Sequence, residues 1–174
     1  MFLTELFDRA TDWKLDSSGT RATFSIDKLQ YIVDFIKDHE INKIELGGPR
    51  EVFKDLWEVN FMLFSEEHAW GTDHVTGTGN AIVVFSTVFE IAKTVMKEKN
   101  IQNLVFTSDA SEPSRAKLYN RMATGFAKEG WRYIDDKEIR ARSRSSNEGD
   151  GFGVMFLLTK QPHPHSLLKG TKHD

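Results

Sequence analysis

The feature that most constrains this sequence is a long apolar segment that begins directly after a turn with two glycines. Its apolar side chains, from Ala81 to Met96, recur at steps of three and four, the spacing of an α-helix, and Lys97 and Lys99 favour an end just beyond them. Ile82, Val83 and Phe89 widen the apolar stripe beyond one face. A helix of this kind must be covered on more than one side, so the rest of the chain has to supply a sheet or further helices to bury it.

Three runs before this helix alternate between apolar and polar residues, and each predicts a strand. They cover residues 21–27, 29–38 and 56–64. In the first run Ala22, Phe24 and Ile26 share one face. We expect the three runs to form an antiparallel meander.

After the helix, residues 104–109 read as a short buried strand and residues 111–130 as a second helix that ends near Gly130. Two more strands follow, over residues 131–136 and 153–160. The fold class is therefore α+β: a mixed, mostly antiparallel sheet with a central helix after the glycine turn and a second packed helix. The strand–helix–strand unit around the second helix favours at least one parallel pair.

The expected organisation is a single domain over residues 1–160. Within it, residues 1–19 form a docking segment with a short helix over residues 2–13. Residues 161–174 follow the domain as a flexible tail. The chain contains no cysteine, which excludes a disulfide framework, a thiol nucleophile and a cysteine-ligated metal. A net charge of −3 does not favour a nucleic-acid partner. The apolar runs are too interrupted for a membrane span, and we expect a cytoplasmic protein.

Three stretches together resemble the GNAT superfamily of N-acetyltransferases. They are the turn TGTGNA over residues 76–81, the strand and helix in LVFTSDASEPSRAKLYNRM, and the closing GWRYIDD. The resemblance extends over roughly residues 20–160. The chain is also similar to GNAT-like proteins of tailed-phage genomes, which would place it in the host cytoplasm or in a virion.

The resemblance implies that acetyl-CoA is a co-substrate. Its pyrophosphate would lie on the glycine turn, and its pantetheine arm would pass between two splayed strands. A helix N-terminus suits a pyrophosphate because its free N–H groups and the positive end of the helix dipole attract anions. Glycines there let the backbone approach the phosphates closely. The implied cradle is formed by Gly77, Thr78, Gly79, Asn80 and Ala81.

The same resemblance places Tyr119 where the family has the general acid that reprotonates the departing CoA thiolate. A phenol with a pKa of about 10 is protonated at neutral pH and suits that task. The alternative is a half-buried tyrosine with a structural role. Glu58 is the candidate base for the amine, acting through a water, and its alternative is a solvated strand face. Arg115 would bind a cofactor phosphate or pair with Glu112.

Two further sets of polar residues are candidates. His68 and His74 flank the glycine turn, where each would act as a base, contact a phosphate or form polar surface. Their spacing matches no metal motif. Three arginines between Ile139 and Ser146 would contact nucleic-acid phosphates or lie in a solvated hairpin.

The sequence also departs from the family pattern. His74 and Val75 stand where the family has glutamine or arginine ahead of its glycines, and the two helices that help to form the acceptor pocket have no counterpart. Two functions follow. The first is a GNAT-type acyltransferase that transfers an acetyl group from acetyl-CoA to an amine or protein acceptor by direct attack. The alternative is a non-catalytic GNAT-fold binding protein, such as a phage virion or host-takeover component, acting through a protein partner or a second copy.

Overall fold

The computed structural model describes residues 10–37, 43–64, 81–107, 113–143 and 154–164. This part of the chain forms nine strands and three helices. In chain order they are β1 (Trp13–Leu15), β2 (Arg21–Ile26), β3 (Leu29–Lys37), β4 (Lys43–Leu46), β5 (Glu51–Lys54), β6 (Leu56–Phe64), α2 (Ala81–Glu98), β7 (Asn103–Thr107), α3 (Pro113–Lys128), β8 (Arg132–Asp135), α4 (Asp136–Arg142) and β9 (Val154–Thr159).

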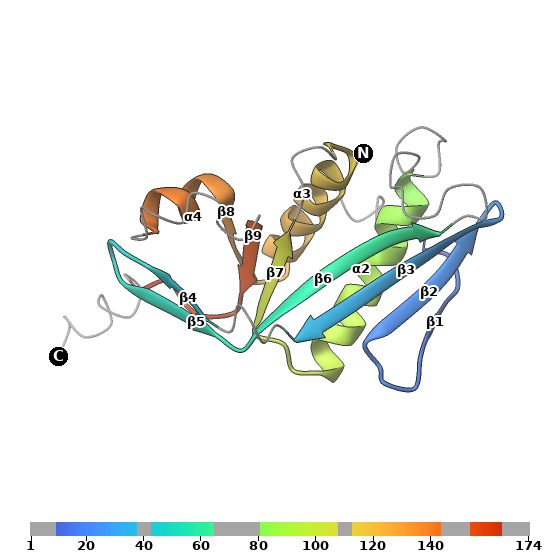
Figure 1. The fold of residues 1–174 in the computed structure, drawn as a ribbon, viewed down its shortest axis with the longest axis horizontal. Coiled ribbons are helices and arrows are strands. Elements are labelled where there is room, and N and C mark those ends of the chain that lie inside the picture. Colours follow the sequence, from blue (N-terminus) through green and yellow to red (C-terminus); the bar gives the residue numbers. More distant parts are fainter. Residues whose placement is uncertain (1–9, 38–42, 65–80, 108–112, 144–153, 165–174) are drawn as a thin grey trace.

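Seven of the strands form one sheet in the order β1-β2-β3-β6-β7-β9-β8, and β4 pairs with β5 in a separate hairpin (Figure 1). β6 and β7 are parallel, and every other neighbouring pair is antiparallel. The predicted α+β class and the mixed, mostly antiparallel sheet are therefore confirmed. The arrangement is compatible with the fold that the family resemblance implies.

The predicted meander is confirmed, since β2, β3 and β6 are successive antiparallel neighbours. The tight turn between β2 and β3 consists of Asp27 and Lys28, because Ile26 already faces Leu29. Both turn residues have positive φ, 49° and 70°, as a two-residue turn of type I′ requires. This turn sets the register that puts Ala22 and the other apolar residues of β2 on one face.

The position of the parallel pair differs from the expectation. The sequence suggested that the pair would flank the second helix, α3, but β9 lies between β7 and β8. The parallel pair instead flanks α2, which connects β6 to β7. The last strand inserts between two strands that precede it, and local sequence patterns carry no signal for such an insertion.

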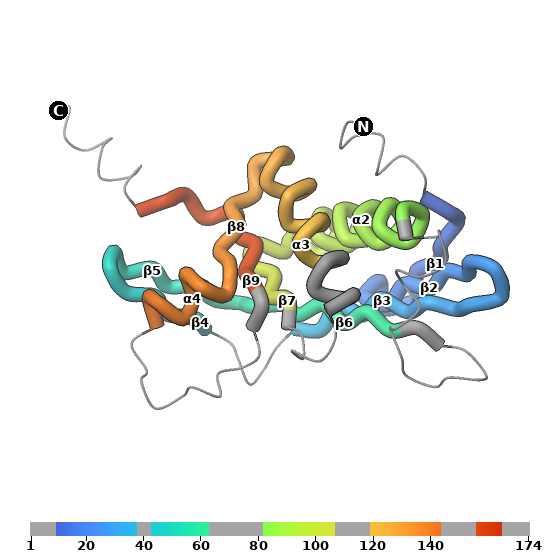
Figure 2. Tube along the Cα trace, turned by 90° about the horizontal axis from the view of Figure 1, so that it is seen from above, coloured from blue at the N-terminus to red at the C-terminus, as the bar shows by residue number. Residues whose placement is uncertain are grey.

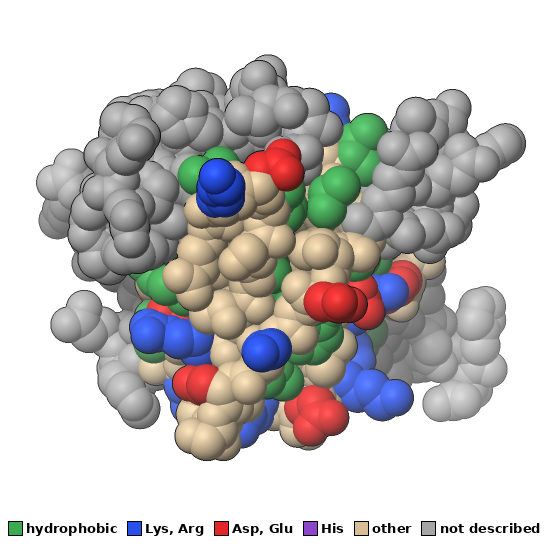
Figure 3. Space-filling model, turned by 90° about the vertical axis from the view of Figure 1, so that its right-hand side faces the viewer, with side chains coloured by type: hydrophobic (Ala, Val, Ile, Leu, Met, Phe, Trp, Pro, Cys, Tyr) green, Lys and Arg blue, Asp and Glu red, His purple; other side chains and the backbone are tan. Residues whose placement is uncertain are grey.

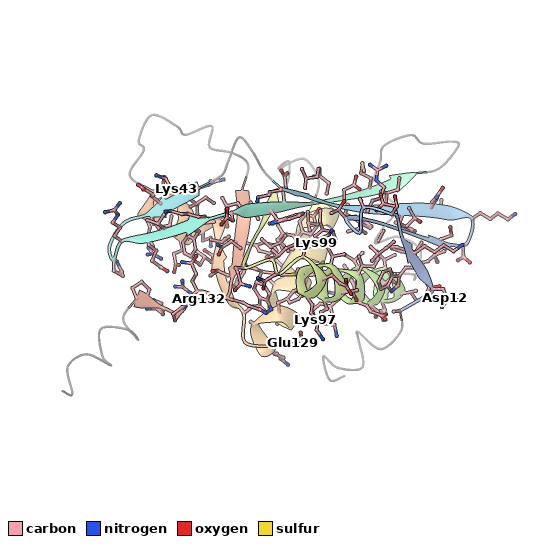
Figure 4. The ribbon with its side chains drawn as sticks, turned by 90° about the horizontal axis from the view of Figure 1, so that it is seen from below. Asp12, Lys43, Lys97, Lys99, Glu129 and Arg132 are labelled. Atoms are coloured by element: carbon pink, nitrogen blue, oxygen red, sulfur yellow. The ribbon has the colours of Figure 1, made fainter. Side chains whose placement is uncertain are left out.

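α2 and α3 cover one face of the sheet and form the main core with it (Figures 2 and 4). In Figure 4, Lys97 and Glu129 lie on the helix side of the sheet and Lys43 lies on the opposite side. α2 is buried as its wide apolar stripe predicted. The residues of α2 with 0% exposure are Val84, Ser86, Thr87, Val88, Ile91, Ala92 and Val95.

The β4–β5 hairpin and α4 cover the other face at the β6–β8 end of the sheet. A second apolar cluster lies beneath them, formed by Leu46, Phe53, Leu56, Val105, Ile134 and Leu157. The sequence analysis predicted no strand between the runs at residues 29–38 and 56–64. Residues 43–54 nevertheless form this hairpin, and their alternate residues complete the second core.

Polar side chains join the hairpin to the sheet. Asn103 donates from Nδ2 to the carbonyl of Lys54 at 2.7 Å, and Thr159 donates to Oδ1 of Asn103 at 2.6 Å. Gln161 donates to the carbonyl of Val52 at 3.1 Å. Gln161 was expected to begin the loose C-terminal tail, but these contacts hold it against β5.

The N-terminal expectation falls partly outside the described residues. Residues 1–9 are not described, and Trp13, the last residue of the expected helix, begins the edge strand β1. A tight turn then leads to β2: the carboxylate of Asp16 accepts hydrogen bonds from Ser18 Oγ at 2.6 Å and from the N–H of Gly19 at 3.1 Å. β1 therefore connects to β2 through a turn, with no helix between the two strands.

Candidate functional site

The two parallel strands at the centre of the sheet separate partway along their length. β6 and β7 pair from Leu56 opposite Asn103 to Val59 opposite Phe106. β6 then continues from Asn60 with β3 as its neighbour and, among the described residues, no strand on its other side. Figure 1 shows the two strands starting side by side and diverging toward the upper edge. We call this opening the β6–β7 gap.

Helix α2 begins at this same edge of the sheet (Figure 1). Its first residue is Ala81, where the glycine turn was expected to end, and its first turn contains no acidic side chain. The N-terminal N–H groups of a helix carry partial positive charge, and here no carboxylate of the first turn offsets it. The other four residues of the expected cradle, Gly77, Thr78, Gly79 and Asn80, lie outside the described residues, as do His68 and His74.

Helix α3 begins at the same edge and carries two of the predicted site residues. Arg115 belongs to its first turn, and the contacts of the Arg115 side chain lie outside the description. Tyr119 lies one turn further and is completely buried. Its ring meets those of Phe106 and Phe156 edge-on, with centroids 5.0 Å and 6.3 Å away. Tyr119 therefore packs on the strand residue at which the β6–β7 gap begins.

Glu58 lies on the opposite face of the sheet from Tyr119. Side chains alternate along a strand, and Val59 joins the main core under the helices, so Glu58 shares its face with Leu56. Its cross-strand neighbours are Ile36 on β3 and Val105 on β7. The half-buried carboxylate of Glu58 therefore lies between the apolar side chains of Ile36 and Val105. Glu58 comes one residue before Val59, after which β6 and β7 separate.

The next row of this face is polar. Arg21 donates two hydrogen bonds to the carboxylate of Asp34, from Nε to Oδ1 at 2.6 Å and from Nη2 to Oδ2 at 2.8 Å. Asp34 faces Asn60 across β3 and β6. The row beyond returns to apolar residues, with Ile32 opposite Met62. The face opposite the helices thus presents Glu58 and Asn60 at the β6–β7 gap, with aliphatic side chains on either side.

A buried ionic cluster, which the sequence reading missed, lies under the hairpin. Glu51 of β5 accepts from Arg142 Nη2 at 2.8 Å, and Arg132 binds both of its oxygens. Burial raises the pKa of the Glu51 carboxyl, but hydrogen bonds from Arg132 and Arg142 outweigh that effect and lower its pKa below 4.5 overall. No sequence pattern around Glu51 identifies it as part of this cluster, because its partners are 81 and 91 residues away along the chain.

The arginine segment after β8 also differs from the expectation. It was read as a loop or solvated hairpin, but its first part is the helix α4, capped by Asp135, whose Oδ1 accepts from the N–H of Glu138 at 2.8 Å. Arg142 points inward and donates to the carbonyls of Gly47 and Pro49 as well as to Glu51. The Arg142 side chain therefore binds groups within the protein, whereas the Arg140 side chain is exposed.

At the end of the molecule that bears the β2–β3 turn, basic and acidic side chains are interspersed (Figure 3). Within the described ranges, no group of three or more His, Asp or Glu residues is arranged to hold a metal ion. In the same part of the chain, no helix has the length and apolar character needed to cross a membrane.

Comparisons of this chain with family models, with curated proteins and with solved structures gave no match.

Proposed function

We propose that this protein is an acyltransferase that moves an acetyl group from acetyl-CoA to an amine. The observation that carries the proposal is the β6–β7 gap, bordered at one edge by the N-terminus of α2. Beyond Val59, β6 has no strand beside it on the β7 side within the described residues, and its backbone there would pair with the amides of an extended thioester arm. The helix N-terminus would receive the negatively charged pyrophosphate.

The side chains around the gap can carry the proton transfers. The amine nitrogen attacks the thioester carbon, the carbon–sulfur bond breaks, and an amide and CoA are formed. Glu58, through a water, takes a proton from the nitrogen, and Tyr119 gives one to the departing sulfur. Glu58 and Tyr119 lie on opposite faces of the sheet. The amine would therefore lose its proton on one face, and the thiolate would receive its proton from the other. Direct attack fits a chain without cysteine, which has no thiol to form an acyl-enzyme.

A second candidate function is a non-catalytic binding protein with this fold, acting through a protein partner. Two observations favour it. Tyr119 has 0% exposure, and a general acid has to reach the sulfur that it protonates. The turn that joins β1 directly to β2 leaves out the helices that help to build an acceptor pocket in the GNAT family. The cytoplasm, or a virion, is the proposed location in either case.

Calorimetric titration with acetyl-CoA, with CoA alone as the comparison, separates the two candidates. The enzyme binds both ligands with one site per chain. Gly79→Asp places a carboxylate in the proposed cradle and should weaken binding at least tenfold. Asn100→Asp is the matched control: Asn100 lies just beyond the other end of α2, is exposed, and accepts a hydrogen bond from Gln102 that an aspartate can also accept.

A wild type that binds neither ligand would eliminate the acyltransferase and leave the binding protein. Equal loss of affinity in both variants would mean that the added charge acts at long range, and it would remove the cradle from the proposal. Circular dichroism on all three proteins checks that the fold is retained.

A further inference from the structure

We infer that the protein accepts only short acyl groups, and that Phe106 and Phe156 are the residues that set this limit. The inference rests on the proposed transfer from acetyl-CoA and adds the range of acyl groups that the same site takes. It follows from the side chains that fill the core on the helix side of the β6–β7 gap.

Three aromatic rings close the helix side of the gap, and we call them the aromatic wall: Phe106 of β7, Phe156 of β9 and Tyr119 of α3. Phe106 and Phe156 face each other across the two strands, and their rings stack with centroids 4.3 Å apart. The ring of Tyr119 meets both edge-on, at 5.0 Å and 6.3 Å. The wall begins at the end of the parallel pairing, because Phe106 is opposite Val59, the last residue of β6 that pairs with β7.

The aromatic wall leaves no space for a longer acyl chain. Its three side chains and that of Val59 are each 0% exposed. A side chain without exposed surface touches no void that could hold a water molecule, either at the surface or enclosed in the core. A methylene group needs about as much room as a water molecule, so each one added to the acyl group would have to displace a packed ring.

The other face of the sheet gives the acyl chain no better place. In the proposed transfer the amine is deprotonated on that face, where Glu58 lies, so a chain there would obstruct the amine. On the β7 side of Glu58 the second core is closed, since Val105 is 3% exposed and its partner on β9, Leu157, is 0% exposed. The acyl group is therefore directed toward the aromatic wall, and the wall determines its length.

Phe156 lies at the centre of these rings. Its ring also meets that of Tyr133 edge-on at 5.2 Å, and Tyr133, on the outer strand β8, is 37% exposed. The ring of Phe156 thus fills the space between the residue at which the gap begins and the edge of the sheet. A smaller side chain at this position would leave a void behind Phe106 that an acyl chain can enter.

Calorimetric titration of the full chain with acetyl-CoA, butyryl-CoA and hexanoyl-CoA tests the inference without requiring a known acceptor. In the wild type we expect the dissociation constant of butyryl-CoA to exceed that of acetyl-CoA by about tenfold or more, the scale at which added methylenes are rejected. Hexanoyl-CoA should bind more weakly still. CoA alone reports the affinity that remains without an acyl group.

Phe156→Leu should reduce the ratio of the hexanoyl-CoA and acetyl-CoA dissociation constants by about fivefold or more, because it makes room in the wall. Phe126→Leu is the matched control. Phe126 is 1% exposed in the same core, and its ring packs on those of Phe89 and Trp131, at 4.7 Å and 5.9 Å. The control should therefore keep the wild-type ratio.

Circular dichroism checks that each variant is folded. Phe106→Leu is a second substitution in the wall, and its ratio should fall as that of Phe156→Leu does. It tests the wall independently if Phe156→Leu does not fold.

The outcomes separate this inference from the proposed function. Acetyl-CoA and hexanoyl-CoA that bind equally well to the wild type overturn the inference and leave the acyltransferase standing. An unchanged ratio in the wall variants also overturns it, as does an equal fall in Phe126→Leu, which would mean that any loosening of the core admits longer chains. A wild type that binds none of the thioesters overturns the proposed function, and the inference falls with it.

Discussion

The ring of Tyr119 meets the ring of Phe106 edge-on, with centroids 5.0 Å apart, and Phe106 is the last residue of β7 that pairs with β6. The candidate acid is therefore packed on the residue at which the two parallel strands separate. This contact joins α3 to the β6–β7 gap. The ring of Tyr119 packs in the core and its hydroxyl is the candidate acid, and two substitutions can test these roles separately.

Tyr119→Phe keeps the ring and removes only the hydroxyl. If the phenol protonates the leaving sulfur, the variant should lose about tenfold or more in kcat while acetyl-CoA affinity stays within twofold, since the lost interaction acts in the transition state. Steady-state kinetics and calorimetric titration measure the two effects. Equal turnover in both proteins would assign Tyr119 to packing alone.

Tyr119→Ala is the companion variant that removes the ring as well. It deletes the contacts with Phe106 and Phe156 in a fully buried site, so the free energy of unfolding should fall by about 3 to 5 kcal/mol. Urea denaturation followed by circular dichroism measures this loss. A loss below 1 kcal/mol would contradict the packing described for this side chain.

Glu51→Gln should destabilise the protein strongly, because it leaves Arg132 and Arg142 facing a neutral amide in a buried site. Removing one partner of a buried pair typically costs about 3 to 5 kcal/mol, and the amide should bring the loss to the lower end of that range. Glu45→Gln on the adjacent strand β4 is the matched control. Glu45 contacts Lys43 at 3.0 Å, but both side chains are about half exposed, so Glu45→Gln should destabilise the protein much less than Glu51→Gln. Similar losses in the two variants would show that the buried cluster stabilises no more than a surface pair.

The pH dependence of stability should differ between wild type and Glu51→Gln. The folded protein holds the pKa of Glu51 below its ordinary value of 4.5, so the contribution of the carboxylate is fully present above pH 4.5 and is lost as the pH falls through the folded pKa. The difference in unfolding free energy between the two proteins should thus narrow in acid. Urea melts at neutral pH and at several values below 4.5 measure it, and a difference independent of pH would contradict the assigned partners.

The glycine turn before α2 gives the last prediction. In the proposed cradle, acetyl-CoA at a hundredfold excess over its dissociation constant should stabilise wild type by roughly 2.7 kcal/mol, and Gly77→Ala and Gly79→Ala should gain less. If the turn is only a corner where α2 packs close to the sheet, alanine at either position should destabilise by about 1 kcal/mol with or without ligand. Thermal melts of the three proteins with and without acetyl-CoA distinguish the two cases. A wild-type melt that does not respond to acetyl-CoA would favour the corner.

The sequence by itself determined the local structure of this protein. Alternation placed β2, β3 and β6 within one residue of their observed ends, and the helical spacing after the glycine turn placed the start of α2 at Ala81. These elements are predictable because the spacing of apolar residues in strands and helices can be recognised within a short stretch of sequence. Periodicity placed Glu58 on a strand and Tyr119 on a helix, but the candidate roles of these residues came from the resemblance to the GNAT superfamily.

Only the tertiary structure decided how those elements meet. The insertion of β9 between β7 and β8 and the separation of β6 from β7 are relations between segments far apart in the chain. The pairing of Glu51 with Arg132 and Arg142 spans 81 and 91 residues, and the placement of Tyr119 and Glu58 on opposite faces depends on the register of three strands. Such contacts form because apolar faces are buried jointly, and that burial is a property of the assembled sheet and helices, which no single segment encodes.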